Sequence, residues 1–227
     1  MNIFKRIFRR IFLGSEEYQK AQAAKHAKRR AARVYAQRKR LERAAETLKE
    51  AHRATQGIFI VADLETTGLS SKAEILELAA VKADASGLIH EELSVLIRPR
   101  GPIPEEIVRL TGITRELVRK RGIVIEQAFP RFMQFCGTHP VFFHNAPFDR
   151  RFVLSAAAVL GYRFENPVLC SLKVARAAWP ELSSHKLAVL SAHIGAPAPT
   201  HRGLDDVKAT LEVLLAAREK AVYSLPT

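Results

Sequence analysis

Two kinds of hydrophobic pattern divide the chain near residue 56. Beyond it, short apolar runs that are rich in β-branched residues and bounded by glycine, proline or polar clusters are typical of strands. We expect five strands, at residues 58–63, 75–83, 89–97, 140–145 and 168–171. Segments with helical periodicity separate and follow the later strands, and the last runs from about Leu204 to Ala221. This order predicts an α/β domain with helices on the faces of a mixed five-stranded sheet.

The first 55 residues carry helical spacing only. Near the start, apolar residues recur at intervals of three and four, and cations fill the positions between them: Phe4, Ile7, Phe8, Ile11 and Phe12, with Lys5, Arg6, Arg9 and Arg10. We expect a basic amphipathic helix over residues 1–14 and a long helix over about 17–54. The long helix has a thin apolar stripe at Ala27, Val34, Leu41 and Leu48. The predicted organisation is therefore a helical extension, residues 1–55, and a globular domain, residues 56–227.

Positive charge is concentrated in this extension. Residues 1–55 hold 16 Lys and Arg against 5 Asp and Glu, whereas the remaining residues hold 20 against 18. The first helix is too short and too charged to span a bilayer, so it suits a membrane surface or a protein partner, an organelle presequence, or docking on its own domain. The second helix is either a solvated spacer or an arm that contacts nucleic-acid phosphates without sequence preference.

Two acids end the first expected strand of the globular domain. Asp63 and Glu65, in the segment "FIVADLETTGL", lie two residues apart and therefore on the same face of a strand. Their Cα atoms would be about 6.6 Å apart, which lets two carboxylates share one metal ion or flank a pair. The alternative is an ordinary strand end with solvated acids.

Two further acids and a histidine are placed by helical logic. Asp149 follows the helix-start signal Asn145-Ala146-Pro147 and shares the apolar stripe of its helix. Asp206 points toward the protein, whereas its neighbour Asp205 lies on a solvated face. His201 precedes this helix on a loop, where it could accept a proton at neutral pH. Converging carboxylates repel one another unless cations lie between them, and an all-oxygen site suits Mg²⁺ or Mn²⁺.

Three motifs make a family resemblance specific. "DLETTGL", "HNAPFD" and "HRGLDD" resemble, in order and spacing, the motifs of the DEDDh 3′–5′ exonucleases, typified by the proofreading (epsilon) subunit of bacterial DNA polymerase III. The resemblance covers about residues 57–220 and implies an RNase H-like fold. Two positions depart from the family pattern, because Gly203 stands where alanine is usual and Ser171 where threonine is common.

The resemblance also implies roles for residues. Asp63, Glu65 and Asp206 would hold two divalent cations, Mg²⁺ or Mn²⁺, and Asp149 would join them directly or through water. His201 would be the general base that activates the attacking water. A slot for the terminal nucleotide would be lined by Thr66, Thr67 and Leu69. The product would be a nucleoside 5′-monophosphate.

We therefore predict a metal-dependent 3′–5′ exonuclease that prefers DNA ends, with an exoribonuclease for short RNA as the alternative. A non-catalytic nucleic-acid or membrane-tethered adaptor is the alternative from another class. No organic cofactor is expected, since no glycine-rich phosphate loop is present. A polymerase or a membrane surface would be contacted through residues 1–55. Cys136 and Cys170 fit a reduced bacterial-type cytoplasm, with attachment to the inner membrane or organelle targeting as further possibilities.

Overall fold

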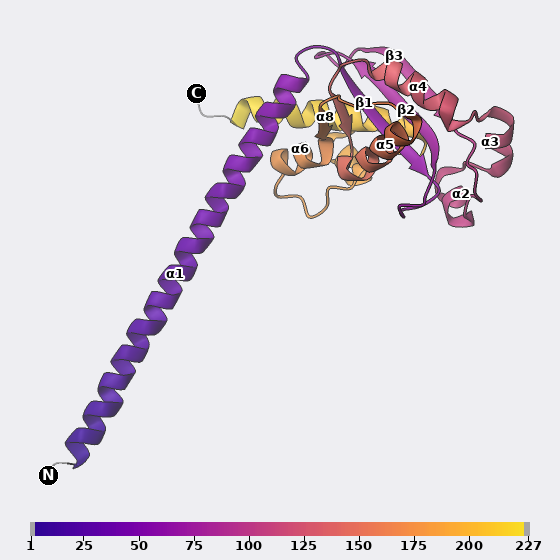
Figure 1. Cartoon of the computed structure of the whole chain (residues 1–227). Coiled ribbons are helices and arrows are strands. Elements are labelled where there is room, and N and C mark those ends of the chain that lie inside the picture. The colour runs from indigo at the N-terminus through magenta and orange to yellow at the C-terminus, as the bar shows by residue number, and fades with distance from the viewer. Residues whose placement is uncertain (1–2, 225–227) are drawn as a thin grey trace. The chain divides into compact units, whose positions relative to one another are not determined.

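The computed structural model describes the backbone of residues 3–224, in two compact units, Met1–Arg43 and Ala44–Thr227 (Figure 1). One helix, α1 (Ile3–Ala54), makes up the described part of the first unit and continues into the second. The sequence predicted two helices here, at 1–14 and about 17–54, but the backbone is helical without a break. A single glycine at position 14 costs a helix only about 1 kcal/mol, and good helix formers flank it.

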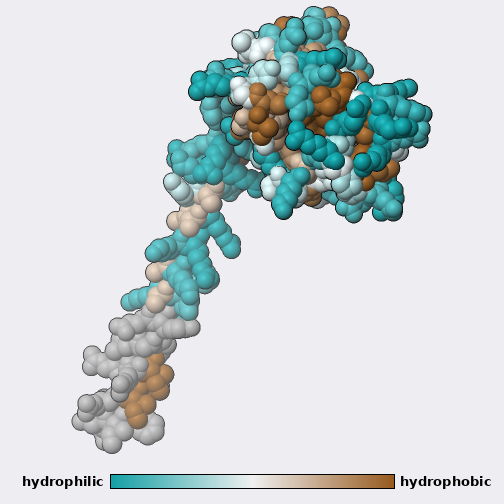
Figure 2. Space-filling model, turned by 45° about the vertical axis from the view of Figure 1, so that its right-hand side comes forward, coloured by the Kyte–Doolittle hydropathy of each residue, from teal (hydrophilic) through white to brown (hydrophobic). Residues whose placement is uncertain are grey.

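Most of the described side chains of α1 are exposed to solvent. The predicted stripe residues Val34 and Leu41 are exposed, as are Ile7 and Ile11. Figure 2 shows hydrophilic residues interspersed with weakly hydrophobic ones along the helix, and a strongly hydrophobic patch among its grey residues. The phenylalanines at positions 4, 8 and 12, on which the predicted amphipathic face depends, have side chains outside the described set. No helix in the described part of the chain is long and apolar enough to cross a bilayer.

The second unit is built on a five-stranded mixed sheet, as the sequence predicted. Its strands are β1 (Phe59–Thr66), β2 (Ile75–Ala83), β3 (Ile89–Leu96), β4 (Val141–Phe143) and β5 (Val168–Cys170). They are arranged in the order β3-β2-β1-β4-β5. β1, β2 and β3 form an antiparallel meander, while β4 and β5 run parallel to β1. The carboxyl ends of β1, β4 and β5 therefore lie at one edge of the sheet.

Alternate residues of the central strands supply the two cores that sandwich the sheet. Phe59 and Val61 pack with α6 (Ser171–Ala178), α7 (Leu187–Ile194) and α8 (Gly203–Ser224). On the opposite face, Ile60 and Ala62 pack with α4 (Ile125–Cys136) and α5 (Ala146–Leu160). Two short helices, α2 (Glu105–Thr111) and α3 (Arg115–Arg121), add a small cluster around Leu76.

The end of α1 belongs to the first of these cores. Leu48 is 8% exposed and Ala51 is fully buried, and both pack against α6 and α8 residues. Thr55 accepts a hydrogen bond from Arg218 of α8 (3.3 Å), and the same guanidinium binds the Ala85 carbonyl (2.8 Å). The compact unit thus begins at Ala44, earlier than the boundary at residue 56 expected from the change in pattern.

Candidate active site

Two acids project from β1 near its carboxyl end. Asp63 and Glu65 lie in the strand itself, opposite Ala79 and Glu77 of β2, and both are half-buried. The strand continues through Thr66, one residue past Glu65, with a register shift between them. Since successive side chains of a strand alternate between faces, the two carboxylates share a face.

The acid on α8 completes a three-carboxylate cluster. Asp206 is buried in the first turn of the helix, and its Oδ1 accepts hydrogen bonds from the backbone N–H groups of Thr200 (3.0 Å) and His201 (3.1 Å). One carboxylate oxygen from each of Asp63, Glu65 and Asp206 lies within 4.8 Å of the others. The neighbouring Asp205 is exposed and accepts a hydrogen bond from the Thr200 hydroxyl (2.6 Å), so it is turned away from the cluster.

The fourth predicted acid lies beside this cluster. Asp149 is only 2% exposed, in the first turn of α5, which begins after Asn145 in the left-handed conformation (φ 74°). Burial raises the pKa of Asp149 well above its usual value, and the charge of Asp63 raises it further. The structure therefore brings Asp149 within electrostatic reach of the cluster without making it one of the three converging carboxylates.

Low solvation and mutual repulsion dominate the electrostatics of the cluster. Burial, followed by the charges of Asp206 and Glu77, raises the pKa of Asp63 to about 7. Burial, followed by the charge of Asp63, raises the pKa of Glu65 to about 8. Burial also raises the pKa of Asp206. Three carboxylates at this spacing need a cation to remain ionised together at neutral pH, and an all-oxygen donor set fits a hard divalent metal ion.

A fifth acid, Glu77, was missed by the sequence reasoning. It lies opposite Glu65 in the β1–β2 register, is 3% exposed, and raises the pKa of both Asp63 and Glu65. Its carboxylate accepts hydrogen bonds from the Ser94 hydroxyl (2.7 Å) and the Gly203 N–H (3.4 Å). The available signal was a single acid within the otherwise apolar strand "ILELAAV".

This contact explains the glycine at the start of α8. A Cβ at Gly203 would lie 2.5 Å from the Ala79 Cβ and about 3.1–3.2 Å from the Glu77 carboxylate. Any side chain here would push α8 away from β2, and Asp206 lies one turn further along that helix. The departure from alanine at this position thus accompanies a close approach between helix and sheet.

His201 stands at the entrance to α8. It has a left-handed backbone (φ 57°) and an exposed side chain. Its charge is among the influences that hold the pKa of Asp206 down, although burial has the larger, opposite effect. The structure thus places His201 next to the cluster and open to solvent.

The turn after β1 contains the three residues expected to line a nucleotide slot. The Thr66 hydroxyl donates to the Gly68 carbonyl (2.8 Å), and the Thr67 hydroxyl accepts from the Glu74 N–H (2.8 Å). Leu69 is 77% exposed, and its carbonyl accepts a hydrogen bond from Arg151. Both hydroxyls therefore shape the turn, while the apolar Leu69 side chain is available to a ligand.

A histidine directly after β4 holds the end of that strand. The His144 ring contacts the Ser171 hydroxyl (3.0 Å) and the His185 carbonyl (3.2 Å), and burial lowers its pKa. Ser171, the second departure from the family pattern, is fully buried. Its hydroxyl links the ends of β4 and β5, a contact that requires a hydroxyl group but not the methyl group of threonine.

Comparison with known proteins supports the family resemblance that was based on the three motifs. Residues 60–214 match the RNase T family model, described as an exonuclease. The DNA polymerase III subunit epsilon of Aquifex aeolicus is 35% identical over 178 residues, which cover 77% of this chain and 87% of that protein. The PolC-type DNA polymerase III of Clostridium perfringens is 37% identical over 158 residues, 69% of this chain. The chain spans only 11% of that polymerase.

Solved structures show the same fold. Exonuclease I of E. coli, in a complex with a dT13 oligonucleotide, aligns with a TM-score of 0.67 at 21% identity over 74% of this chain and 42% of that one. Exonuclease X, in a complex with 5′ overhanging duplex DNA, aligns with a TM-score of 0.59 at 26% identity over 71% of this chain and 91% of that one. The family model covers well over half of this chain, so the chain belongs to the RNase T family of exonucleases, as the three motifs predicted.

Proposed function

We propose that this chain is a metal-dependent 3′–5′ exonuclease that releases nucleoside 5′-monophosphates from DNA 3′ ends. The observation that carries the proposal is the convergence of Asp63, Glu65 and Asp206 oxygens within 4.8 Å, in a setting that raises the pKa of all three. Similarity to a polymerase III epsilon subunit supports a role at DNA ends in replication or repair.

The proposed chemistry uses residues on both sides of the cluster. Two Mg²⁺ or Mn²⁺ ions, when bound, would orient the attacking water and stabilise the leaving 3′ oxygen. Asp63, Glu65 and Asp206 would hold these ions, and Asp149 would contribute directly or through water. His201 takes the proton as the water oxygen bonds to the terminal phosphorus. The bond from phosphorus to the 3′ oxygen of the preceding nucleotide then breaks, leaving a shortened strand and a 5′-monophosphate.

Substrate selection is assigned to the turn after β1. The exposed Leu69 side chain provides an apolar surface for the terminal base, with Thr66 and Thr67 forming the turn that presents it. The pair Thr66-Thr67 resembles the DNA-editing branch of the family and supports DNA over short RNA. An exoribonuclease is the alternative for the same site.

The test is a 3′-end digestion assay with Mg²⁺ or Mn²⁺ on single-stranded DNA, mismatched duplex DNA and short RNA. We expect 5′-mononucleotides from DNA. We also expect at least about a 100-fold loss of kcat in Asp63→Ala and Asp206→Ala, since even the residues that support metal ligands typically contribute 10–100-fold. Asp205→Ala is the matched control, because this exposed neighbour has the same charge on the same helix.

Retained cleavage in both Asp63→Ala and Asp206→Ala would refute the site. A preference for RNA would select the exoribonuclease alternative. If the wild-type protein binds ends and cleaves none, the adaptor alternative would replace the enzyme.

We further propose that the extension makes an auxiliary contact. Its first 55 residues hold nearly all of the net charge, and Ile7 and Ile11 are exposed. These features support binding to an anionic membrane surface, to a polymerase or to nucleic-acid phosphates. Flotation with anionic vesicles and DNA binding at low salt, each with and without residues 1–43, test the membrane and phosphate contacts. Equal binding before and after the deletion would count against all membrane and phosphate roles.

A further inference from the structure

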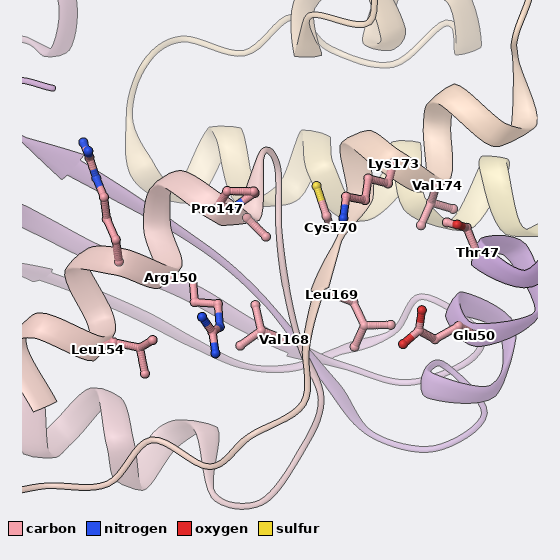
Figure 3. A pocket seen from close by; sticks show the side chains of 12 residues that line it. Thr47, Glu50, Pro147, Arg150, Leu154, Val168, Leu169, Cys170, Lys173 and Val174 are labelled. Carbon is pink, nitrogen blue, oxygen red and sulfur yellow. The ribbon is translucent and has the colours of Figure 1, made fainter. Parts of the chain in front are cut away.

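A cavity of about 550 Å³ opens beside the edge strand β5 (Figure 3). Its walls come from α5, β5, the first turn of α6 and the end of α1, all within the unit Ala44–Thr227. Figure 3 shows the charged side chains of Arg150, Lys173 and Glu50 around this space, with Val168 and Leu169 of β5 between them. No role assigned above uses this cavity.

The net charge of the side chains that line the cavity is positive. Arg150 and Lys173 come from different helices, both are exposed, and neither has a carboxylate within ion-pair distance in the described part of the chain. The first turn of α6 contains no acid. Asp149, the acid in the first turn of α5, is buried and faces the carboxylate cluster. Glu50, on the α1 wall, is the one acid among the lining residues. A third lining cation, Arg151, donates to the Leu69 carbonyl.

The cavity lies beside β5, whose carboxyl end is at the same end of the sheet as the carboxyl end of β1. β4 and β5 run parallel to β1, and α5 and α6 begin directly after them, so the first turns of both helices face the edge where Asp63 and Glu65 lie. β5 is two strand spacings from β1, about 10 Å. Asp149 and Arg150 are consecutive on α5 and thus point about 100° apart. One side chain faces the acids and the next lines the cavity.

The remaining walls suit the uncharged parts of a nucleotide. Pro147, Leu154, Val168 and Leu169 provide apolar surface around the two cations. A strand with regularly spaced phosphates, and with sugars and bases between them, matches two cations with apolar surface around them. A free phosphate ion would use the cations and leave the apolar walls unoccupied.

We infer that this cavity is an upstream nucleic-acid subsite, in which Arg150 and Lys173 bind phosphates of the substrate strand a few nucleotides before its 3′ end. The inference rests on the proposed nuclease function and extends it. A strand whose end lies at the carboxylate cluster continues across the first turn of α5 into the cavity. The subsite would give longer strands higher affinity than dinucleotides.

The test measures KM for oligothymidylates from dT2 to dT10, in the wild type and in Arg150→Gln/Lys173→Gln. In the wild type we expect KM to fall about tenfold from dT2 to dT10. In the double variant we expect most of this decrease to be absent. Arg131→Gln/Arg163→Gln is the matched control, since it removes two exposed cations of the same unit that do not line the cavity. The control should keep the wild-type length dependence.

A binding measurement separates failure of the subsite from failure of the nuclease proposal. In an Asp63→Ala background, anisotropy of 5′-labelled dT10 over a salt series reports phosphate contacts without cleavage. Losing two contacts should reduce the slope of log K against log salt by about 1.4, since each single-strand phosphate contributes about 0.7. An unchanged slope, or an equal change in the control, would overturn the subsite even if the wild type cleaves DNA. If the slope changes but the wild-type protein cleaves no DNA, the subsite would be upheld and the nuclease proposal rejected.

Discussion

Each acid near the carboxyl end of β1 has a pKa set first by burial and then by its acidic neighbours. Glu77 shows how far this effect extends, because it shifts both β1 acids while its own carboxylate is held by Ser94 and Gly203. The ionised carboxylates thus repel one another, and a bound cation would reduce this repulsion. Proton and metal ion should therefore compete for the same oxygens.

Stability without metal should decrease as the pH rises. The folded pKa values of Asp63 and Glu65, about 7 and about 8, lie above the ordinary values near 4, so the folded state binds more protons than the unfolded state across this window. The stability contribution is complete below about pH 4 and is lost as pH rises through the folded values. We expect Tm in EDTA to fall by at least about 2 °C between pH 5 and pH 8, equivalent to about 1 kcal/mol for a chain of this size.

Excess Mg²⁺ should raise Tm above its value in EDTA by more at pH 8 than at pH 5, because fewer protons compete with the metal ion at pH 8. Asp63→Asn/Glu65→Gln is the control, since it keeps the shape of both side chains and removes their titration. A pH slope equal to that of the wild type in this variant would show that other groups produce it.

Secondary-structure elements with a clear hydrophobic periodicity could be predicted from the sequence. Features that depend on contacts between distant residues could not. The strand at Ile75–Ala83 matches its predicted bounds and the strand at Ile89–Leu96 ends one residue earlier than predicted, since turn residues delimit both. Asp149 and Asp206 could be placed because helical stripes separate inward from outward positions. Glu77 could not, because only the β1–β2 register shows which β2 residue faces Glu65.

The start of α8 provides a prediction at the same scale. Replacing a glycine in a helix with alanine normally stabilises it by about 1 kcal/mol. At Gly203 the added Cβ would meet Ala79 at 2.5 Å, and overpacking of this kind costs about 1–3 kcal/mol. We therefore expect Gly203→Ala to lower the free energy of unfolding and to reduce kcat by displacing Asp206. Urea denaturation and the digestion assay measure both, and a more stable variant would contradict the predicted clash.

The whole molecule divides at Arg43, within a continuous helix, and this division leads to a truncation prediction. Removing residues 1–43 should leave Tm and kcat unchanged. Removing residues 1–55 also removes Leu48 and Ala51 from the core and the hydrogen bond between Arg218 and Thr55. Loss of one buried leucine side chain alone costs about 2–5 kcal/mol, so Tm should fall sharply.

Thermal melts of both truncations measure this difference, with Leu48→Ala in the full chain as a check on the packing. If both truncations melt like the intact protein, the end of α1 would not be part of the folded unit. The change in composition near residue 56 could not reveal this boundary, because Leu48 is a single apolar position on a basic helix.

The placement of Asp206 on α8 has a consequence for synthesis of the protein. The cluster joins β1, near the beginning of the domain, to the last helix of the described chain, which also packs against the end of α1. A ribosome would therefore release nearly all of the domain before the third carboxylate could reach its partners. Contacts between residues so distant in sequence also form late in folding. A domain translated only as far as β5 has no complete acid cluster, so cleavage becomes possible only after α8 has been made.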